Sequence, residues 1–272
     1  MKLSWKQSAI LLVALFNFGC GGVDTGLSAG PTSPGAPIAA NTTEAVAGSP
    51  GAAEFLARNA AQGFASVEDR SVGQNRFLVF TSRGDLIPAD TNGVRDVYLR
   101  DLRTGEMRLI SVATNGTQGN GDSTQGSISA DGRFVVFRSA ATNLVTGDGN
   151  GVTDIFLHEI ATGTTTRVST ATGGTEVSGA SLTPAISANG RYVVFASSAP
   201  NLVATDSNGA QDIFLKDVTT DTTTLVSSNS AQTDSANGAS FDPAITAGTT
   251  TEGEFIAFST EATDIVAGGL NG

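Results

Sequence analysis

The sequence predicts an all-β fold built from a four-stranded antiparallel unit that recurs along the chain. Three observations lead to this prediction: an apolar strand returns at steady intervals, a second patterned strand follows it each time, and turn-forming dipeptides separate the strands. The composition agrees, because 33 of the 272 residues are glycine and only 15% are charged. Such a chain favours short strands joined by many turns over helices.

The apolar strand marks each copy of the unit. Its four copies begin at Arg76, Arg133, Arg191 and Glu254, so the steps between them are 57, 58 and 63 residues. The last step is the longest because residues 248–253 add length. Each copy is a nearly continuous apolar run without polar alternation, which predicts burial on both faces.

The other strands of each copy follow in a fixed order. A short first strand, such as residues 127–129, leads into Asp131-Gly132, a dipeptide typical of tight hairpin turns. The third strand begins at Asp96 in the first copy, and apolar and polar residues start to alternate there, as expected near an outer edge. A Thr-Gly turn at 104–105 opens the fourth strand. Four short antiparallel strands per repeat predict the blades of a β-propeller.

The repeats define the predicted domain organisation. They occupy residues 63–272, with copies at about 65–126, 127–184, 185–243 and 244–272. The fourth copy is cut short, so we expect about three and a half blades and an incomplete ring, since closure needs at least about four blades. Two explanations stay open: either the sequence is a truncated frame or fragment of a longer chain, or several subunits close one ring.

The first 62 residues predict an export signal and a tether. Residues 1–19 combine Lys2 and Lys6 with an apolar run at 9–16, which has the length of a signal-peptide core and is too short to span a bilayer. Residues 20–62 are rich in Gly, Ala, Ser, Thr and Pro and predict a flexible tether.

The signal resembles that of a bacterial lipoprotein. Gly19 precedes Cys20, the one cysteine of the chain, although Asn17 departs from the usual aliphatic residue. The resemblance implies lipid attachment at Cys20 after cleavage, and a membrane contact through this anchor only. Because Gly21 is not aspartate, it favours the outer membrane over the inner one. The alternative is an ordinary secretory signal with an incidental cysteine.

The repeat itself also resembles a known family. The succession Ser-x-Asp-Gly-Arg-Phe-x-x-Phe, then Asp-x-Asn-Gly-x-x-Asp-Ile-Phe-Leu, then Thr-Gly-Thr-Thr-Thr-Arg-Val-Ser is similar to the WD-like propeller repeat of the TolB family. The likeness covers about residues 65–272. It implies a propeller, a place in the periplasm or at the cell surface, and contact with peptidoglycan-associated partners. No partner-binding residue carries over, because the shared motifs build the blades.

The loop between the second and third strands is a candidate calcium site. Every complete copy has the pattern Asp-x-Asn-Gly-x-x-Asp, and a hard cation prefers such oxygen-bearing side chains. The candidate ligands are Asp90, Asn92, Asp96, Asp148, Asn150, Asp154, Asp206, Asn208 and Asp212, with Asp85, Asn143 and Asn201 upstream. The alternative is conformational, since Asx turns and Asn-Gly build the same loop without metal. The fourth copy, with Gly269 at the first Asp position, favours that alternative.

Two other features invite a functional interpretation. His158 is the only histidine, but its repeat equivalents are Arg100 and Lys216, so we expect a solvent-facing polar position and no catalytic role. The stretches 114–126 and 170–184 either form a sugar- or peptide-binding rim or simply connect the blades. The net charge of −11 argues against nucleic acid as a partner.

The sequence therefore predicts a non-enzymatic, lipid-anchored propeller that binds an envelope protein or polymer as a scaffold. No cofactor is expected beyond the candidate calcium. Two alternatives remain: the propeller portion of a longer secreted hydrolase or lyase, and a calcium-stabilised surface adhesin.

Overall fold

The computed structural model describes residues 70–73, 76–246 and 255–265. These residues form strands, turns and irregular connections, and within them no helix is long and apolar enough to cross a membrane. The predicted signal peptide, the tether and Cys20 lie outside the described residues.

The described chain folds into consecutive antiparallel sheets, which we call blades 1 to 4. The strands of each blade pair in chain order. Blade 1 consists of β1 (Arg70–Gly73), β2 (Phe77–Ser82), β3 (Asp96–Asp101) and β4 (Met107–Leu109). Blade 2 consists of β5 (Ser123–Ile128), β6 (Phe134–Ser139), β7 (Asp154–Glu159) and β8 (Thr164–Arg167). Blade 3 consists of β9 (Ser181–Ile186), β10 (Tyr192–Ser197), β11 (Asp212–Asp217) and β12 (Thr222–Leu225). The described part of blade 4 consists of β13 (Ser240–Ile245) and β14 (Ile256–Thr260).

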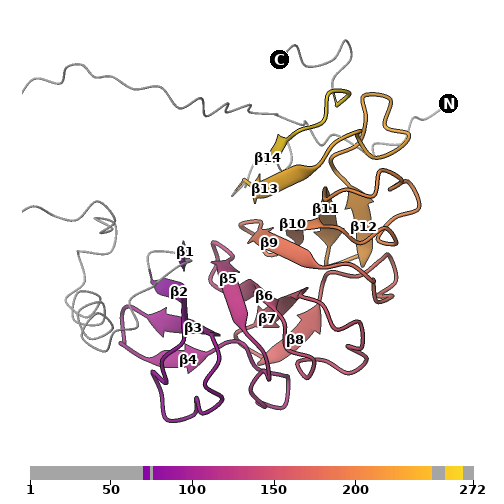
Figure 1. Cartoon of the computed structure of the whole chain (residues 1–272). Coiled ribbons are helices and arrows are strands. Elements are labelled where there is room, and N and C mark those ends of the chain that lie inside the picture. The colour runs from indigo at the N-terminus through magenta and orange to yellow at the C-terminus, as the bar shows by residue number, and fades with distance from the viewer. Residues whose placement is uncertain (1–69, 74–75, 247–254, 266–272) are drawn as a thin grey trace, which may run out of the picture.

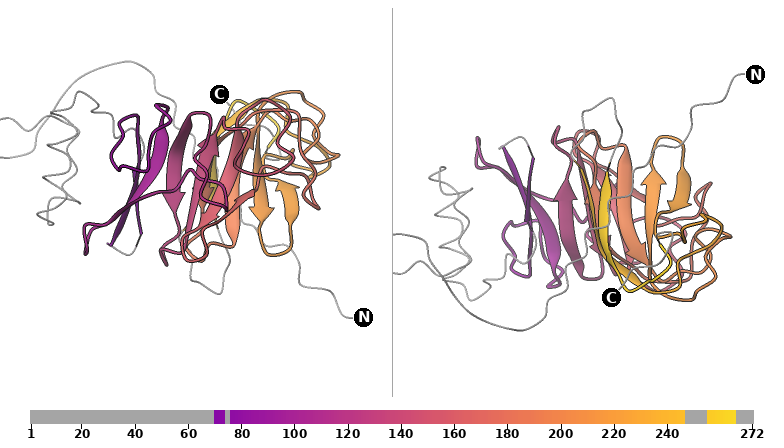
Figure 2. Two further views of the ribbon diagram at one scale, coloured as in Figure 1. Left: turned by 90° about the horizontal axis from the view of Figure 1, so that it is seen from below. Right: turned by 90° about the horizontal axis from the view of Figure 1, so that it is seen from above.

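The blades follow one another along an arc. The first strand of each blade, β1, β5, β9 and β13, lies on the inner side of the arc, and the fourth strands β4, β8 and β12 lie on the outer side (Figure 1). Seen at right angles to this view, the sheets stand beside one another in a row (Figure 2). The prediction of an all-β propeller fold with four-stranded antiparallel blades is confirmed.

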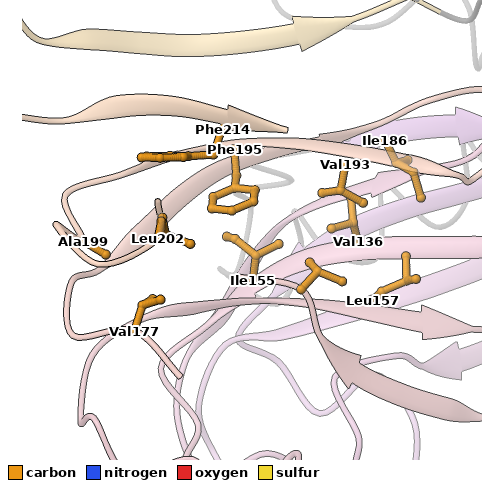
Figure 3. Packing of buried hydrophobic residues seen from close by; sticks show 11 residues of the cluster. Val136, Ile155, Leu157, Val177, Ile186, Val193, Phe195, Ala199, Leu202 and Phe214 are labelled. Atoms are coloured by element: carbon orange, nitrogen blue, oxygen red, sulfur yellow. The ribbon is translucent and has the colours of Figure 1, made fainter. Parts of the chain in front are cut away.

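The second strands explain why their sequences are apolar throughout. Alternate residues of β10 face different neighbours: Val193 and Phe195 belong to a core cluster with residues of blade 2, whereas Val194 and Ala196 belong to a cluster with residues of blade 4. Figure 3 shows the cluster between blades 2 and 3, where Phe195 faces Ile155. Three of the four core clusters thus lie between two blades, and the fourth lies on blade 1 alone. The predicted burial of the second strands on both faces is confirmed.

The first strands are longer than the sequence predicts. β5 begins at Ser123, β9 at Ser181 and β13 at Ser240, so the repeat boundaries at 127, 185 and 244 fall inside strands. In blades 2, 3 and 4 a β-bulge interrupts the pairing of the first strand with the second, between Thr124 and Ser127 in blade 2. The bulge hides the strand's upstream half, because it breaks the period-two pattern by which a strand is recognised.

The third strands are more buried than their alternating pattern indicates. The position of Arg100, His158 and Lys216 was expected to face solvent, and this expectation is wrong for two of the three. His158 is 5% exposed and Lys216 is 2% exposed, while Arg100 is half-buried. The cause is a contact between blades: Lys216 Nζ donates to Thr170 Oγ1 of the preceding connection (3.0 Å) and pairs with Asp221 Oδ1 (2.5 Å). His158 Nδ1 lies 2.9 Å from Thr165 Oγ1, and burial lowers the pKa of its imidazole.

Candidate cation sites

The asparagines of the three candidate loops form Asx turns. The Oδ1 atoms of Asn92, Asn150 and Asn208 each accept the backbone N–H two residues ahead, at 3.1, 3.0 and 2.6 Å. Their Nδ2 atoms donate to backbone carbonyls of the connection that follows the fourth strand, at 2.7–3.0 Å. These side chains fasten one loop to another, as the conformational alternative predicts.

The aspartate that begins each third strand is buried and held by a serine. Asp96, Asp154 and Asp212 each accept a hydrogen bond from the serine hydroxyl that follows the fourth strand, at 2.5, 2.6 and 2.5 Å. The same serine oxygen accepts the backbone N–H one residue after the aspartate, at 2.9–3.1 Å. In blades 2 and 3 the other carboxylate oxygen accepts the asparagine amide of the Asx turn. Burial raises the pKa of all three carboxyls, and these hydrogen bonds partly offset the rise.

The first aspartate of the loop has fewer hydrogen-bond partners. Asp90 is 3% exposed and Asp206 is 9% exposed, and the Oδ1 atom of each is buried without a hydrogen-bond partner. Burial, together with the charges of neighbouring aspartates, raises the pKa of each carboxyl to about 6. In blade 1, Tyr98 donates its hydroxyl to Asp90 Oδ2. Phe214 stands at the equivalent register position of blade 3 and offers no hydroxyl.

In blade 2 an arginine pairs with the first aspartate of the loop. Arg167, at the end of β8, is 8% exposed in its side chain, and its Nη1 atom lies 3.3 Å from Asp148 Oδ1 and 2.7 Å from Glu176 Oε1. The same atom lies 3.7 Å from Asp154 Oδ2, and Nη2 donates to the carbonyl of Gly147 at 3.1 Å. A guanidinium therefore occupies the centre of this acidic cluster.

The upstream candidates do not join the acidic pairs. Asn143 Oδ1 accepts the N–H of Asn120 (2.9 Å) and Asn201 Oδ1 accepts the N–H of Ser178 (3.1 Å), so both fasten the neighbouring connection. Asp85 is exposed and acts on Asp90 through its charge. Within the described ranges, no three His, Cys, Asp or Glu side chains form a ready-made metal site.

The repeat alignment missed Arg167, Glu176 and Asp234. A signal was present, because Arg167 is the charged residue at a register position that Leu109 and Leu225 occupy in blades 1 and 3. The role of Arg167 depends on ion pairs with acidic residues from two separate loops, which the repeat pattern does not connect.

No protein-family model and no curated protein matches the chain. Solved structures match in fold. TolB from Acinetobacter baumannii is 19% identical with a TM-score of 0.39, and the match covers 60% of this chain and 32% of that one. The β-propeller domain of the Trilobed protease from Pyrococcus furiosus is 11% identical, with a TM-score of 0.38 and coverage of 59% and 41%.

A prolyl endopeptidase matches at 15% identity and a TM-score of 0.41, over 69% of this chain and 24% of that one. The chain thus spans less than half the length of each of these structures. The assignment of its blades rests on the strand pairing described above.

Proposed function

We propose that the protein is a non-enzymatic propeller scaffold of the bacterial envelope, which binds a polymer or protein with the inner side of its arc. It is exported and held at the outer membrane by lipid on Cys20. The observation that carries the binding surface is a repeated strained bulge in the inner strands. Gln125, Thr183 and Asp242 stand at the same place in β5, β9 and β13, and have positive φ of 56, 47 and 49°.

These three positions are costly for the backbone. A non-glycine residue in the left-handed region is strained, and such residues tend to cluster at functional sites. The residues at these positions are polar, and they belong to the inner strands of the arc (Figure 1). Gln125 Oε1 accepts the N–H of Thr183 in the next blade (3.0 Å), Thr183 Oγ1 is buried without a partner, and Asp242 is exposed.

The test replaces all three residues by glycine, which adopts positive φ without strain. The triple variant should stay close to the wild type in urea unfolding, because relief of strain offsets the lost hydrogen bond between Gln125 and Thr183, yet it should lose binding. The probe is purified peptidoglycan sacculi in a co-sedimentation assay. Gln232→Gly is the matched control, because Gln232 has the same φ of 56° in an exposed outer connection. Sacculi binding that survives in the triple variant would contradict the proposed surface.

The lipid anchor has its own test. Cells expressing the chain are labelled with radioactive palmitate, and the wild-type protein should carry the label in the outer-membrane fraction. Cys20→Ser should remove the label, because Cys20 is the one cysteine. Gly21→Asp, the control, should keep the label and move the protein to the inner membrane. Label retained in Cys20→Ser would overturn the anchor.

A further inference from the structure

Neighbouring blades meet at a contact surface, the seam, and a chain of hydrogen bonds that begins at His158 closes the seam between blades 1 and 2. His158 Nδ1 lies 2.9 Å from Thr165 Oγ1 in the adjacent strand β8. Thr165 Oγ1 donates to the carbonyl of Val112 in blade 1 (2.5 Å), and the Thr165 N–H donates to Thr114 Oγ1 (3.0 Å). Because the one hydroxyl proton of Thr165 goes to Val112, the imidazole donates from Nδ1.

The seam between blades 2 and 3 has the same chain, but it begins at a lysine. Lys216 Nζ donates to Thr223 Oγ1 (3.2 Å), and Thr223 Oγ1 donates to the carbonyl of Thr170 (2.6 Å). The lysine is 2% exposed, and its Nζ atom lies 2.5 Å from Asp221 Oδ1 and 3.0 Å from Thr170 Oγ1. A carboxylate and a hydroxyl thus compensate the permanent positive charge of this seam.

The seam of His158 lacks both groups. Gly163 stands where blade 3 has Asp221, and Val112 stands where the next connection has Thr170. His158 is 5% exposed, so a positive charge on its imidazole would be buried without a counter-ion. Such a charge is costly, which makes the neutral imidazole the form that fits the closed seam.

No charged side chain of the surrounding elements replaces the missing carboxylate. In the blade 1 connection at 110–118 and in the turn at 160–163, no residue is charged. The strands β6, β7 and β8 carry the charged residues Arg133, Arg138, Asp154, Glu159 and Arg167. None of these acts on His158, because burial is the cause that lowers the pKa of its imidazole.

We propose that His158 makes the seam between blades 1 and 2 sensitive to pH: the neutral imidazole closes the seam, and uptake of a proton in mild acid opens it. Since Nδ1 already carries a hydrogen, the proton adds at Nε2. The seam between blades 2 and 3 stays closed in the same range, because Lys216 keeps its charge and its partner Asp221.

The direction follows from the two forms of the seam. An imidazole in water has a pKa of 6.5, and burial in the closed seam lowers it. The open form therefore takes up the proton more readily, so the closed form is fully favoured above pH 6.5 and loses stability as the pH falls below it. Each unit below this value raises the equilibrium constant for opening by up to about tenfold, until the closed form is protonated as well.

The first test follows the imidazole directly, because His158 is the one histidine of the chain. A pH titration of the full chain by proton NMR should place its midpoint below 6.5. Gly163→Asp should raise the midpoint, since it supplies the carboxylate that Asp221 supplies to Lys216. The turn accepts a side chain, because Asp221 has φ of 54° where Gly163 has 69°, and a Cβ atom at Gly163 would meet no other atom within 4 Å.

Gly163→Asn is the matched control for Gly163→Asp, because it has the same shape without the charge. Its midpoint should stay close to that of the wild type. A wild-type midpoint at or above 6.5 would overturn the proposal. Equal midpoints in the aspartate and asparagine variants would show that this turn does not face the imidazole.

The second test follows the seam itself by hydrogen exchange of the full chain at pH 7.5 and pH 5, with rates corrected for the intrinsic effect of pH. In the wild type, residues 110–118 and β8 should lose about tenfold in protection at pH 5, relative to residues 168–176 and β12 of the lysine seam. His158→Gln keeps a donor for Thr165 without titrating, so the difference between the two seams should no longer depend on pH.

Two results would contradict the opening of the seam. One is wild-type protein whose two seams respond equally to acid, and the other is His158→Gln protein that loses protection as the wild type does. If His158→Gln does not fold, the variants at Gly163 decide by the same measurement. Gly163→Asp should keep the seam protected at pH 5 and Gly163→Asn should not, and equal protection in both would overturn the proposal.

Discussion

Asp90 illustrates how the blades place carboxyl groups away from water. Its carboxyl accepts the Tyr98 hydroxyl and faces the charges of Asp96 and Asp85. Burial and these charges raise its pKa from 3.8 to about 6. Between these two values the folded protein holds a proton that the unfolded chain has already lost. Raising the pH through this window therefore lowers the free energy of unfolding.

The prediction at this scale compares the wild type with Asp90→Asn. The amide keeps an acceptor for Tyr98 and removes the titration. The two proteins should have similar urea midpoints near pH 4, and the variant should become progressively more stable than the wild type up to about pH 6, beyond which the difference should stay constant. Unfolding curves from pH 4 to 8 with EDTA present give this difference. A difference that does not change with pH would show that Asp90 does not titrate as described.

At the scale of the element, the hairpin between the first and second strands joins one blade to the next. Gly190 lies in the turn between β9 and β10 with φ of 72°. A Cβ atom there would overlap the ring of Phe134 at the start of β6 in the preceding blade. The glycine therefore serves both the turn and the seam between blades, whereas the sequence indicated only the turn.

Gly190→Ala should reveal this second role. The left-handed alanine costs about 1 kcal/mol and the overlap with Phe134 adds about 1–3 kcal/mol, so the total destabilisation should be about 2–4 kcal/mol. Gly147→Ala is the matched control, because Gly147 has φ of 78° and a Cβ atom added there would meet no other atom within 4 Å. It should cost about 1 kcal/mol. Equal losses in urea unfolding would exclude packing between blades as the cause.

The elements also show what sequence could and could not predict. Strands and turns repeat with the blade, so a pattern seen three times identifies them, and the second strand's apolar run reports its two buried faces. The upstream half of each first strand was missed because the bulge breaks its alternation. The burial of Lys216 and the role of Arg167 depend on contacts between different loops or blades, which a repeat alignment does not contain.

For the whole molecule, the described blades contact their neighbours in chain order. β5 packs against blade 1, β9 against blade 2 and β13 against blade 3, and the described strands of blades 1 and 3 share no extensive contact. Stability in such an array is approximately a sum over units and their seams. Disturbing one seam should therefore weaken nearby blades more than distant ones.

Hydrogen exchange tests this expectation with two buried aromatic residues. Phe195 lies in the core between blades 2 and 3, and Phe80 lies in the core of blade 1. Replacing either by alanine should cost about 3–5 kcal/mol locally. Phe195→Ala should speed amide exchange most in β9–β12 and least in β2–β3, and Phe80→Ala should give the reverse. Uniform acceleration in both variants would mean that the blades unfold as one unit.

The repeated seam also bears on how such a chain can lengthen during evolution. Phe77 meets Gly132 of the next blade and Phe134 meets Gly190 of the one after, so consecutive seams are made by the same pair of positions. A duplicated unit of 57 or 58 residues, the spacing of the aromatic residues at 77, 134 and 192, would carry both halves of the seam with it. Gene duplication can therefore insert a blade without inventing a new interface. Later divergence, such as leucine against arginine at the end of the fourth strand, can then give each copy its own chemistry.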